Sequence, residues 1–339
     1  MKFRNNVVIK TLGIPTIYSF SDLASKLSIS QSTLYTMLNK KWYFYSEKQI
    51  PKKDGTNREL RVPMLSLKVV QKWILVEILQ KISVSEFSMA FVPKRNGLLA
   101  SAEMHRKNLF FLEMDIHNFF GSITEQKIYK LFCDMGYNFD VASILTGLCT
   151  YDGVLPQGAV TSPYLANLVC FNLDARLNGL CRKRDIVYSR YADDLCFSSN
   201  NRTILNKIEP IVEKILLDEG FEANKKKTRY LSDDTRKTIV GITVNNKEIH
   251  VAKQLKRRLR AKIYNAISTG NYSMRGEIIG TIAYITSIEK GYKKTILKYI
   301  EMITMRETLR DNMKIVEKYN ENKFFKESKD MLPLIKEYE

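Results

Sequence analysis

The sequence predicts an α+β fold, because strand-like and helix-like segments follow one another along a chain of 339 residues. Segment 109–116 is mostly apolar and aromatic, and the flanks of Ala192-Asp193-Asp194 within 187–199 are rich in the Val, Tyr, Leu and Phe that favour strands. Segments 203–219 and 252–267 instead repeat apolar residues at helical spacing. A chain of this length is long enough for one core with two or three subdomains.

Residues 1–45 are predicted to be a helical extension. Apolar residues at helical spacing flank a short Ser-Ile-Ser break, and this pattern resembles a helix-turn-helix: Leu23, Leu27, Ile29, Leu34 and Leu38. One interpretation is a DNA-binding module. The favoured one is a small helical extension that packs on the segment after it, because short motif matches have a high false-positive risk.

Residues 42–63 are predicted to form a hairpin, because WYFYSEKQI and RELRVP flank a Pro/Gly turn at 51–55. Arg58 stands in the second strand, and by itself it is an exposed strand arginine. A helix is predicted to follow. Its apolar residues recur at helical spacing and are expected in the core: Leu65, Val69, Trp73, Val76 and Leu79.

Asp115, Asp193 and Asp194 are the candidate catalytic residues. Segment 109–116 is apolar up to Asp115 and polar soon after it, which places this carboxylate near the end of a buried strand. The sequence YADD at 191–194 lies between strand-like flanks, so ADD is predicted to be the tip of a hairpin. Taken singly, Asp115 fits a capping residue and the Asp pair fits a solvated polar turn.

Three carboxylates from two segments favour a site for two Mg²⁺ ions. A tight turn would hold Asp193 and Asp194 together with no basic residue beside them, and such a pair repels itself unless a cation is bound. Mg²⁺ prefers oxygen ligands and commonly takes one or two carboxylates with substrate phosphates. Two metal ions in an in-line displacement lie about 3.5–4 Å apart, and Asp115 with Asp193 would bridge them. The pattern indicates phosphoryl transfer.

The segment LPQGAVTSPYLANLV at 155–169 lies between these carboxylates. Gly158 after Gln157 allows the backbone to approach a ligand closely. Ser162 is predicted to be the N-cap of a helix with Pro163 at its first position. That helix carries a mostly apolar stripe: Ala166, Asn167, Val169, Cys170, Leu173 and Leu177.

The last third of the chain is predicted to be helical and basic. Residues 203–219 form a helix that ends at Gly220. In the helix over 252–267, Leu255, Leu259, Ile263 and Ile267 form an apolar stripe. The other faces carry cations that we expect to bind phosphates, because acids are nearly absent there: Lys253, Lys256, Arg257, Arg258, Arg260 and Lys262. Residues 292–318 are predicted to form another amphipathic helix.

The composition agrees with a polyanionic partner. The chain has 54 Lys and Arg against 36 Asp and Glu, a net charge of +18. Its five cysteines lack zinc-ligand spacing and are expected to be buried free thiols: Cys133, Cys149, Cys170, Cys181 and Cys196. Neither a signal peptide nor a long apolar span is visible, so we expect a cytoplasmic protein that does not enter a membrane.

Taken in order, these motifs resemble those of a reverse transcriptase. They are RELRVP with the helix after it, Asp115 followed five residues later by Phe120, LPQG with SP and N, YADD, and EGFEANKKKT at 219–228. The resemblance runs from about Arg58 to Val244. It implies a right-hand polymerase with fingers, palm and helical thumb that makes DNA on an RNA template with dNTPs and two Mg²⁺ ions.

The resemblance also implies roles for single residues. Arg58 would contact the triphosphate, Lys227 would lie near the nucleotide phosphates, and Gln157 with Gly158 would line the nucleotide site. Phe120 would lie beneath the incoming sugar, with its neighbour Phe119 in the core. The implied subdomains are the extension at 1–45, fingers at 46–110, a palm with interleaved finger elements at 111–244, and the thumb and tail at 245–339.

Within that family the chain is most similar to the bacterial retron enzymes. Their NAxxH element corresponds to Ser101-Ala102-Glu103-Met104-His105, and their VTG element to Ile239-Val240-Gly241. His105 and Gly241 would then contribute to RNA binding. The resemblance implies a structured non-coding RNA as template and primer, a branched RNA–DNA product known as msDNA, an effector protein, and a role in anti-phage defence.

Two departures keep alternatives open. Asn becomes Ser in the first element, and in the second Thr becomes Val, which removes one hydroxyl. An abortive-infection or unclassified bacterial reverse transcriptase is one alternative. A catalytically inert nucleic-acid-binding protein is the other, although a purely structural palm has no need of three clustered aspartates.

Overall fold

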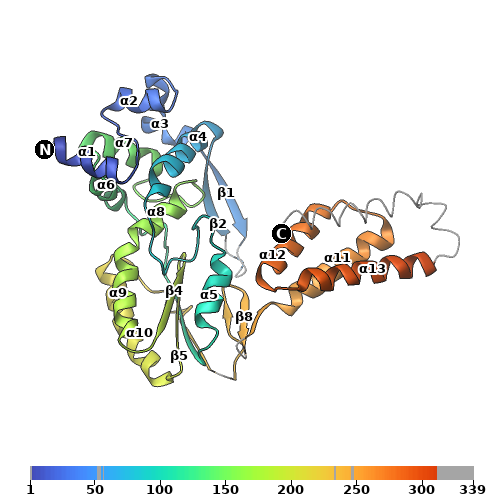
Figure 1. Cartoon of the computed structure of the whole chain (residues 1–339). Helices are drawn as coiled ribbons and strands as arrows, with labels where there is room; N and C mark the ends of the chain where they lie inside the picture. Colours follow the sequence, from blue (N-terminus) through green and yellow to red (C-terminus); the bar gives the residue numbers. More distant parts are fainter. Residues whose placement is uncertain (1, 52–54, 56, 233, 246–247, 311–339) are drawn as a thin grey trace. The chain divides into compact units, whose positions relative to one another are not determined.

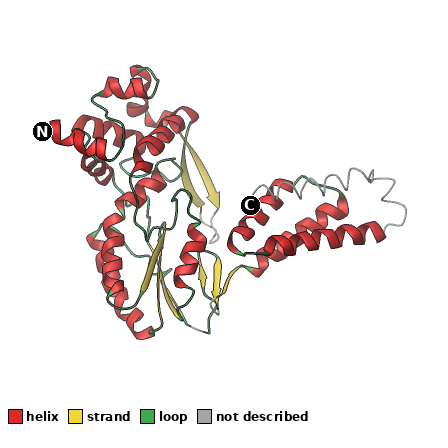
Figure 2. Ribbon diagram, viewed as in Figure 1, coloured by secondary structure: helices red, strands yellow, loops and turns green. Residues whose placement is uncertain are grey.

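The computed structural model describes residues 2–51, 55, 57–232, 234–245 and 248–310 (Figure 1). The chain divides into two compact units. The first is formed by residues 1–97 and 108–233, and the second by residues 98–107 and the described residues after 233. Helices and antiparallel sheets occur in both units, which confirms the predicted α+β class (Figure 2).

A four-stranded antiparallel sheet is the centre of the first unit, with the strand order β4-β5-β3-β6. Its strands are β3 (Phe110–Asp115), β4 (Val187–Tyr191), β5 (Asp194–Ser199) and β6 (Arg229–Leu231). Helices α9 (Phe171–Arg182) and α10 (Arg202–Asp218) pack along it (Figure 1). The predicted strands at 109–116 and 187–199, and the helix that stops before Gly220, are confirmed.

The N-terminal segment is helical and packs on the first unit. It contains α1 (Lys2–Thr11), α2 (Phe20–Lys26) and α3 (Gln31–Asn39). Leu23 and Leu34 are fully buried, because α2 and α3 pack against α7 (Phe139–Cys149). The Tyr137 hydroxyl also donates to the Pro15 carbonyl at 2.9 Å. The apolar stripe of this segment is therefore used in packing, as in the favoured interpretation, but its partner is α7 and not the segment that directly follows it.

A two-stranded hairpin follows at β1 (Tyr45–Pro51) and β2 (Asn57–Pro63), as predicted; residues 52–54 and 56 of its turn lie outside the described residues. The core assignment for the next helix, α4 (Leu65–Trp73), is partly wrong. Leu65 and Val69 are 78% and 61% exposed, whereas Leu67 and Val70 are buried. The helix places its other face against α7 and β2, and the chain continues through a π-helix at Ile74–Ile78.

The helix after LPQG begins at Ser162, so its N-cap lies one residue before the predicted one. Thr161 is the N-cap of α8 (Ser162–Val169), and the Ser162 hydroxyl donates to the Pro156 carbonyl at 2.8 Å. The predicted single helix is two, because the chain breaks at Cys170 before α9 begins. Other helices of the first unit include α6 (Glu125–Asp134).

The second unit combines one helix from the middle of the chain with elements from its end. These are α5 (Gly97–His105), the sheet β7-β8-β9 (Thr238–Ile239, Ile242–Asn245 and Glu248–Val251), α11 (Lys253–Thr269), α12 (Arg275–Ile288) and α13 (Tyr292–Arg310). The stripe residues Leu259, Ile263 and Ile267 are buried as predicted. The predicted end of the last helix, from residue 311 onward, lies outside the described residues.

The cysteines are free thiols, as predicted, and four of the five are buried. Burial raises the pKa of the Cys149 thiol to about 12 and that of Cys170 to about 11, so both are protonated at neutral pH. Among the described helices, none combines the length and the apolar character needed to span a bilayer.

Candidate active site

Strand pairing brings the three aspartates to one end of the palm sheet. Tyr191 pairs with Asp194 across a two-residue turn, which confirms the hairpin tip. In the neighbouring pair of strands, Asp115 is directly opposite Asp194. The Ile116 amide also donates to the Asp193 carbonyl at 2.9 Å. Residues that are 78 positions apart in sequence, Asp115 and Asp193, thus lie on adjacent strand ends.

Asp115 already has a cationic partner. Lys227 Nζ donates to Asp115 Oδ2 at 2.7 Å, and Asn224 Nδ2 donates to Oδ1 at 3.0 Å. A backbone bond from the Asn224 amide to the Asp115 carbonyl, at 2.7 Å, fixes this segment beside β3. Residues close to Asp115 in the sequence do not indicate this ion pair, because the lysine that forms it comes 112 positions later.

Asp193 and Asp194 are less well compensated. Burial raises the pKa of Asp193, and the charge of Asp115 adds to this effect, while Lys227 and Arg58 oppose it. The pKa of Asp194 rises to about 6, through loss of hydration and then through the charges of Asp193 and Asp115. Asp194 is an exposed residue at the start of β5. Such clustered carboxylates with raised pKa are typical of functional sites.

The donor chemistry of this cluster fits a hard divalent cation. Three carboxylates supply the oxygen ligands that Mg²⁺ prefers, and a bound cation would relieve the repulsion that raises the pKa of Asp194. The ligand geometry is not preformed: among the described residues, no three His, Cys, Asp or Glu side chains stand close enough to hold a metal ion. Lys227 instead pairs with Asp115, so metal binding would require this lysine to give up part of its contact.

Gly158 permits a close approach, but to the protein's own backbone. An added Cβ at Gly158 would lie 2.9 Å from the Arg61 carbonyl oxygen, and the φ of Gly158 is +118°. The Arg61 amide donates to the Gln157 carbonyl at 2.8 Å. The predicted role of this glycine in ligand approach is therefore at least partly structural, since it ties the β1–β2 hairpin to the palm. Arg58, three residues before Arg61, lies exposed on the same strand.

Phe119 and Phe120 have different environments. Phe119 is 4% exposed and its ring packs near that of Phe221, with centroids 6.0 Å apart. Phe120 is only partly buried at the edge of the core. The strand ends at Asp115, and both phenylalanines lie in the turn after it, where their rings meet edge to face with centroids 5.3 Å apart. This arrangement agrees with a core role for Phe119 and leaves Phe120 as the candidate for the sugar contact.

In the second unit, the cations of α11 are not equally available. Lys256 Nζ pairs with Glu289 at 2.5 Å, and Lys262 pairs with Glu277. Arg260 stacks on Tyr299, 5.3 Å from the ring centroid. Glu277 of α12 and Glu289 directly after it therefore neutralise two of the cations on α11. The sequence of α11, in which acids are nearly absent, had led us to expect all of its cations to be available for phosphates. Lys253, Arg257 and Arg258 are exposed on the same helix.

His105 and Gly241 have structural positions in the second unit. His105 ends α5 and its side chain is fully buried; burial lowers the pKa of the imidazole to about 3, so it is neutral at physiological pH. A buried neutral histidine offers no surface to RNA in this state. Val240 and Gly241 form the two-residue turn between β7 and β8, and both have positive φ, which suits glycine.

The structure also shows polar residues that sequence reasoning did not assign to the site. Arg190, Asp174 and Asn167 are fully buried around the β4–β5 turn. Asp174 within an apolar helix stripe, and Arg190 within an apolar strand, were the only signs of them in the sequence. A buried charge requires a partner of opposite charge, so the two charged residues at apolar positions, Asp174 and Arg190, could have been predicted to pair with each other.

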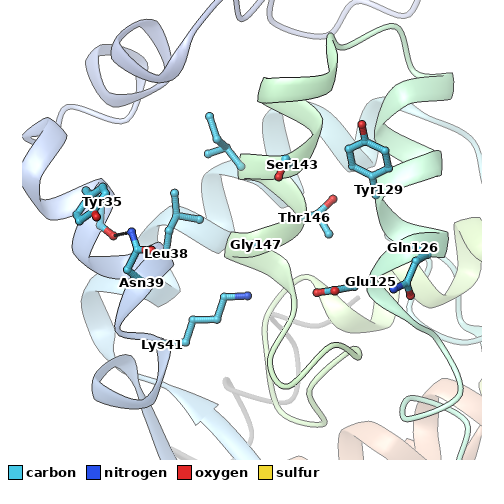
Figure 3. Close-up of a pocket in the computed structure, with 11 residues that line it drawn as sticks. Tyr35, Leu38, Asn39, Lys41, Glu125, Gln126, Tyr129, Ser143, Thr146 and Gly147 are labelled. Carbon is cyan, nitrogen blue, oxygen red and sulfur yellow. Dashed lines mark hydrogen bonds between the residues drawn. The ribbon is translucent and has the colours of Figure 1, made fainter.

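A separate pocket of about 540 Å³ lies between α3, α6 and α7 (Figure 3). Lys41 and Glu125 extend into it, and the Lys41 ammonium donates to the Thr150 carbonyl at 3.2 Å. Burial lowers the pKa of Lys41, while the charge of Glu125 opposes this effect. Its lining contains none of the predicted site residues, so it is distinct from the aspartate cluster.

Comparison with known proteins agrees with this geometry. The model of the reverse transcriptase (RNA-dependent DNA polymerase) family matches residues 50–251. The retron Ec86 reverse transcriptase of Escherichia coli is 31% identical over 305 residues, which cover 89% of this chain and 94% of that protein. The retron Mx65 reverse transcriptase of Myxococcus xanthus is 31% identical over 80% of this chain and 69% of its own length.

Among solved structures, telomerase from Candida albicans is similar at 12% identity with a TM-score of 0.48, over 87% of this chain and 63% of that chain. The chain thus spans less than two thirds of that telomerase chain. The chain belongs to the reverse transcriptase family, the RNA-dependent DNA polymerases with a right-hand fold. Within this family it is of the retron type.

Proposed function

We propose that this RNA-directed DNA polymerase copies a cognate structured non-coding RNA into a branched RNA–DNA, and that this product serves in anti-phage defence. The observation that supports polymerisation in this chain is the convergence of Asp115, Asp193 and Asp194 on adjacent strand ends. The similarity to retron enzymes over most of the chain supports the nature of the template and product.

Polymerases of this family generally use divalent metal ions, and we assign two Mg²⁺ ions to the aspartate cluster. When bound, they would activate the attacking hydroxyl and neutralise the leaving pyrophosphate. Asp115 and Asp193 would hold both ions, with Asp194 in support. Arg58 would bind the triphosphate through its fork of donors. Lys227, whose Nζ donates to Asp115 in the metal-free protein, would move toward the nucleotide phosphates once a metal ion binds that carboxylate.

The test of polymerisation is dNTP incorporation on a primed RNA template with and without Mg²⁺. Asp193→Asn removes one charge and keeps the side-chain shape, so we expect activity to fall by about three orders of magnitude or more. RNA binding should persist, because the proposed RNA contacts lie on α11 in the second unit. Activity within tenfold of the wild type would count against the metal site, and an inactive wild type would favour the inert binding protein.

The identity of the template is tested by sequencing nucleic acid that co-purifies with the protein. We expect one structured RNA joined to DNA through a 2′-linked branch. Recovery of linear DNA alone would favour an abortive-infection or unclassified reverse transcriptase. Loss of the nucleic acid in a host that expresses Asp193→Asn would show that the DNA is made by this chain.

A further inference from the structure

Behind the turn that carries Asp193, a fully buried ion pair joins two elements of the first unit. Arg190 of β4 donates from Nε and Nη2 to the two carboxylate oxygens of Asp174 in α9, each at 2.8 Å. Both side chains are 0% exposed, and the Tyr188 hydroxyl donates to Asp174 Oδ1 at 2.8 Å. Buried ion pairs often contribute little net stability compared with apolar replacements, so this pair calls for another explanation.

The remaining terminal nitrogen of Arg190 reaches the catalytic turn. Nη1 donates to the Ala192 carbonyl and to Asn167 Oδ1, both at 3.2 Å. Ala192 has a φ of +57°, a left-handed conformation that residues other than glycine rarely adopt. Strained backbone of this kind persists only where the surroundings hold it, and it is common at functional sites.

The same network is fastened to a third segment. The Arg190 amide donates to the Phe87 carbonyl at 2.9 Å, and the Met89 amide donates to the Arg190 carbonyl at 2.7 Å. Asn167 Nδ2 donates to the Ala90 carbonyl at 2.8 Å. Because these partners come from residues 87–90, α8 and α9, the guanidinium has little freedom to move.

We infer that Arg190 is a positioning residue: it holds Ala192 in the left-handed conformation that aims Asp193 and Asp194 toward Asp115. Asp174 and Asn167 in turn fix the guanidinium. This inference rests on the proposed metal site, because its consequence is the arrangement of metal ligands. Partners that orient ligands in this way typically change metal affinity by about 10–100-fold when they are removed.

Arg190→Lys is the informative variant. It keeps a positive charge opposite Asp174, yet a single ammonium cannot replace the planar fork that binds Asp174 and Ala192 together. Leu173→Ala is the matched control, because Leu173 is equally buried in α9 and its side chain forms no polar contact. Thermal unfolding of both variants checks that each one folds.

Three readouts separate positioning from general stability. Mn²⁺ binding to the metal-free protein, followed by electron paramagnetic resonance, should weaken by about 10–100-fold in Arg190→Lys and by less than about threefold in Leu173→Ala. Amide hydrogen exchange should quicken across residues 187–199 in Arg190→Lys only. The Mg²⁺ concentration for half-maximal DNA synthesis should rise in step with the loss of Mn²⁺ binding.

Ala192→Gly supplies a rescue, since glycine adopts the left-handed region without strain. Adding Ala192→Gly to the Arg190→Lys variant should raise its Mn²⁺ affinity by at least about threefold. Equal losses in Arg190→Lys and Leu173→Ala, unchanged binding in Arg190→Lys, or no rescue by glycine would overturn the inference. A wild-type protein that binds no Mn²⁺ would instead count against the proposed metal site, while hydrogen exchange would still report on Arg190.

Discussion

Asp193 and Asp194 carry most of the uncompensated charge of the candidate site, and the residues around them determine how it is used. Lys227 and Asn224 bind Asp115, so one of the three carboxylates is neutralised before any cation arrives. The other two have raised pKa values because burial and mutual repulsion disfavour their charged forms. The site therefore combines one carboxylate that is paired with a lysine and two carboxylates that have no ion pair in the described part of the chain.

Protonation of Asp194 should compete with metal binding. With a pKa of about 6, this carboxyl is mostly protonated at pH 5, so we expect Mn²⁺ affinity at pH 5 to be roughly tenfold weaker than at pH 8. Isothermal titration between pH 5 and pH 8 measures this. The Asp194→Asn variant should bind Mn²⁺ more weakly than the wild type at pH 8, and its Mn²⁺ affinity should depend less on pH. Parallel pH profiles for the two proteins would contradict the assignment.

The same group affects the stability of the metal-free protein. The folded pKa of Asp194 lies above its unfolded value, so the folded state binds the proton more tightly. Its stabilising contribution is fully present below about pH 4 and is lost as the pH rises through about 6. In chemical unfolding without metal, the wild type should therefore lose stability relative to Asp194→Asn, which has no titrating carboxyl at this position, as the pH rises from about 4 to about 7.

Phe120 should select the sugar of the incoming nucleotide. A ring beneath C2′ leaves room for hydrogen but not for hydroxyl, so Phe120→Ala should raise the kcat/KM for rNTP relative to dNTP. Phe119→Ala should instead lower the free energy of unfolding by about 3–5 kcal/mol, because Phe119 is buried. Steady-state kinetics with both nucleotide types and chemical denaturation test the pair. Unchanged discrimination in Phe120→Ala would remove the sugar contact from the proposal.

At the scale of elements, the sequence of α4 did not identify which face of that helix is buried. Helix α4 buries Leu67 and Val70 against α7 and β2 and leaves Leu65 and Val69 exposed. Both sets recur at intervals compatible with a helix, so periodicity alone permits either face to be buried. The packing partner decides which one is.

This difference gives a paired stability prediction. Leu67→Ala should destabilise the protein by about 2–5 kcal/mol, because Leu67 is 2% exposed and its loss leaves a cavity. Leu65→Ala, two residues away at 78% exposure, should change the free energy of unfolding by less than about 0.5 kcal/mol. Urea denaturation of both variants makes the comparison, and similar losses would mean that Leu65 is covered in solution.

For the whole molecule, the net charge of +18 gives a general attraction to nucleic acid, whereas position decides which cations bind it. On α11, Lys256 and Lys262 are held by glutamates, and Arg260 lies on an aromatic ring. Lys253, Arg257 and Arg258 are exposed and are the better candidates for phosphate contacts. The excess of charge in the sequence therefore overstates the number of available cations.

The salt dependence of RNA binding tests this distinction. Each lost phosphate contact reduces the slope of log affinity against log salt by about 0.7–0.9. Replacing Lys253, Arg257 and Arg258 with Gln should therefore flatten the slope by about two units or more if each contacts a phosphate. Lys262→Gln, the matched control with an ion-paired lysine, should change it by less. Fluorescence anisotropy over a salt series measures both, and equal effects per residue would contradict the assignment.

The local features of this protein follow from its amino-acid sequence alone. Strand-forming residues around YADD predicted a hairpin, the polar change after Asp115 predicted a strand end, and the ordered motifs indicated a reverse transcriptase. These features depend on neighbours within a few positions, where propensity and periodicity operate.

Which distant groups meet depends on the tertiary fold. Packing brings Lys227 to Asp115 and holds Arg190 in the buried position from which it donates to the Ala192 carbonyl. Packing against α7 and β2 likewise determines which face of α4 is buried. These contacts cannot be predicted from a single sequence, because the partner of a buried charge comes from whichever distant segment the fold places beside it. The physical reason is that burial makes unpaired charge costly, so the fold supplies partners wherever its segments converge.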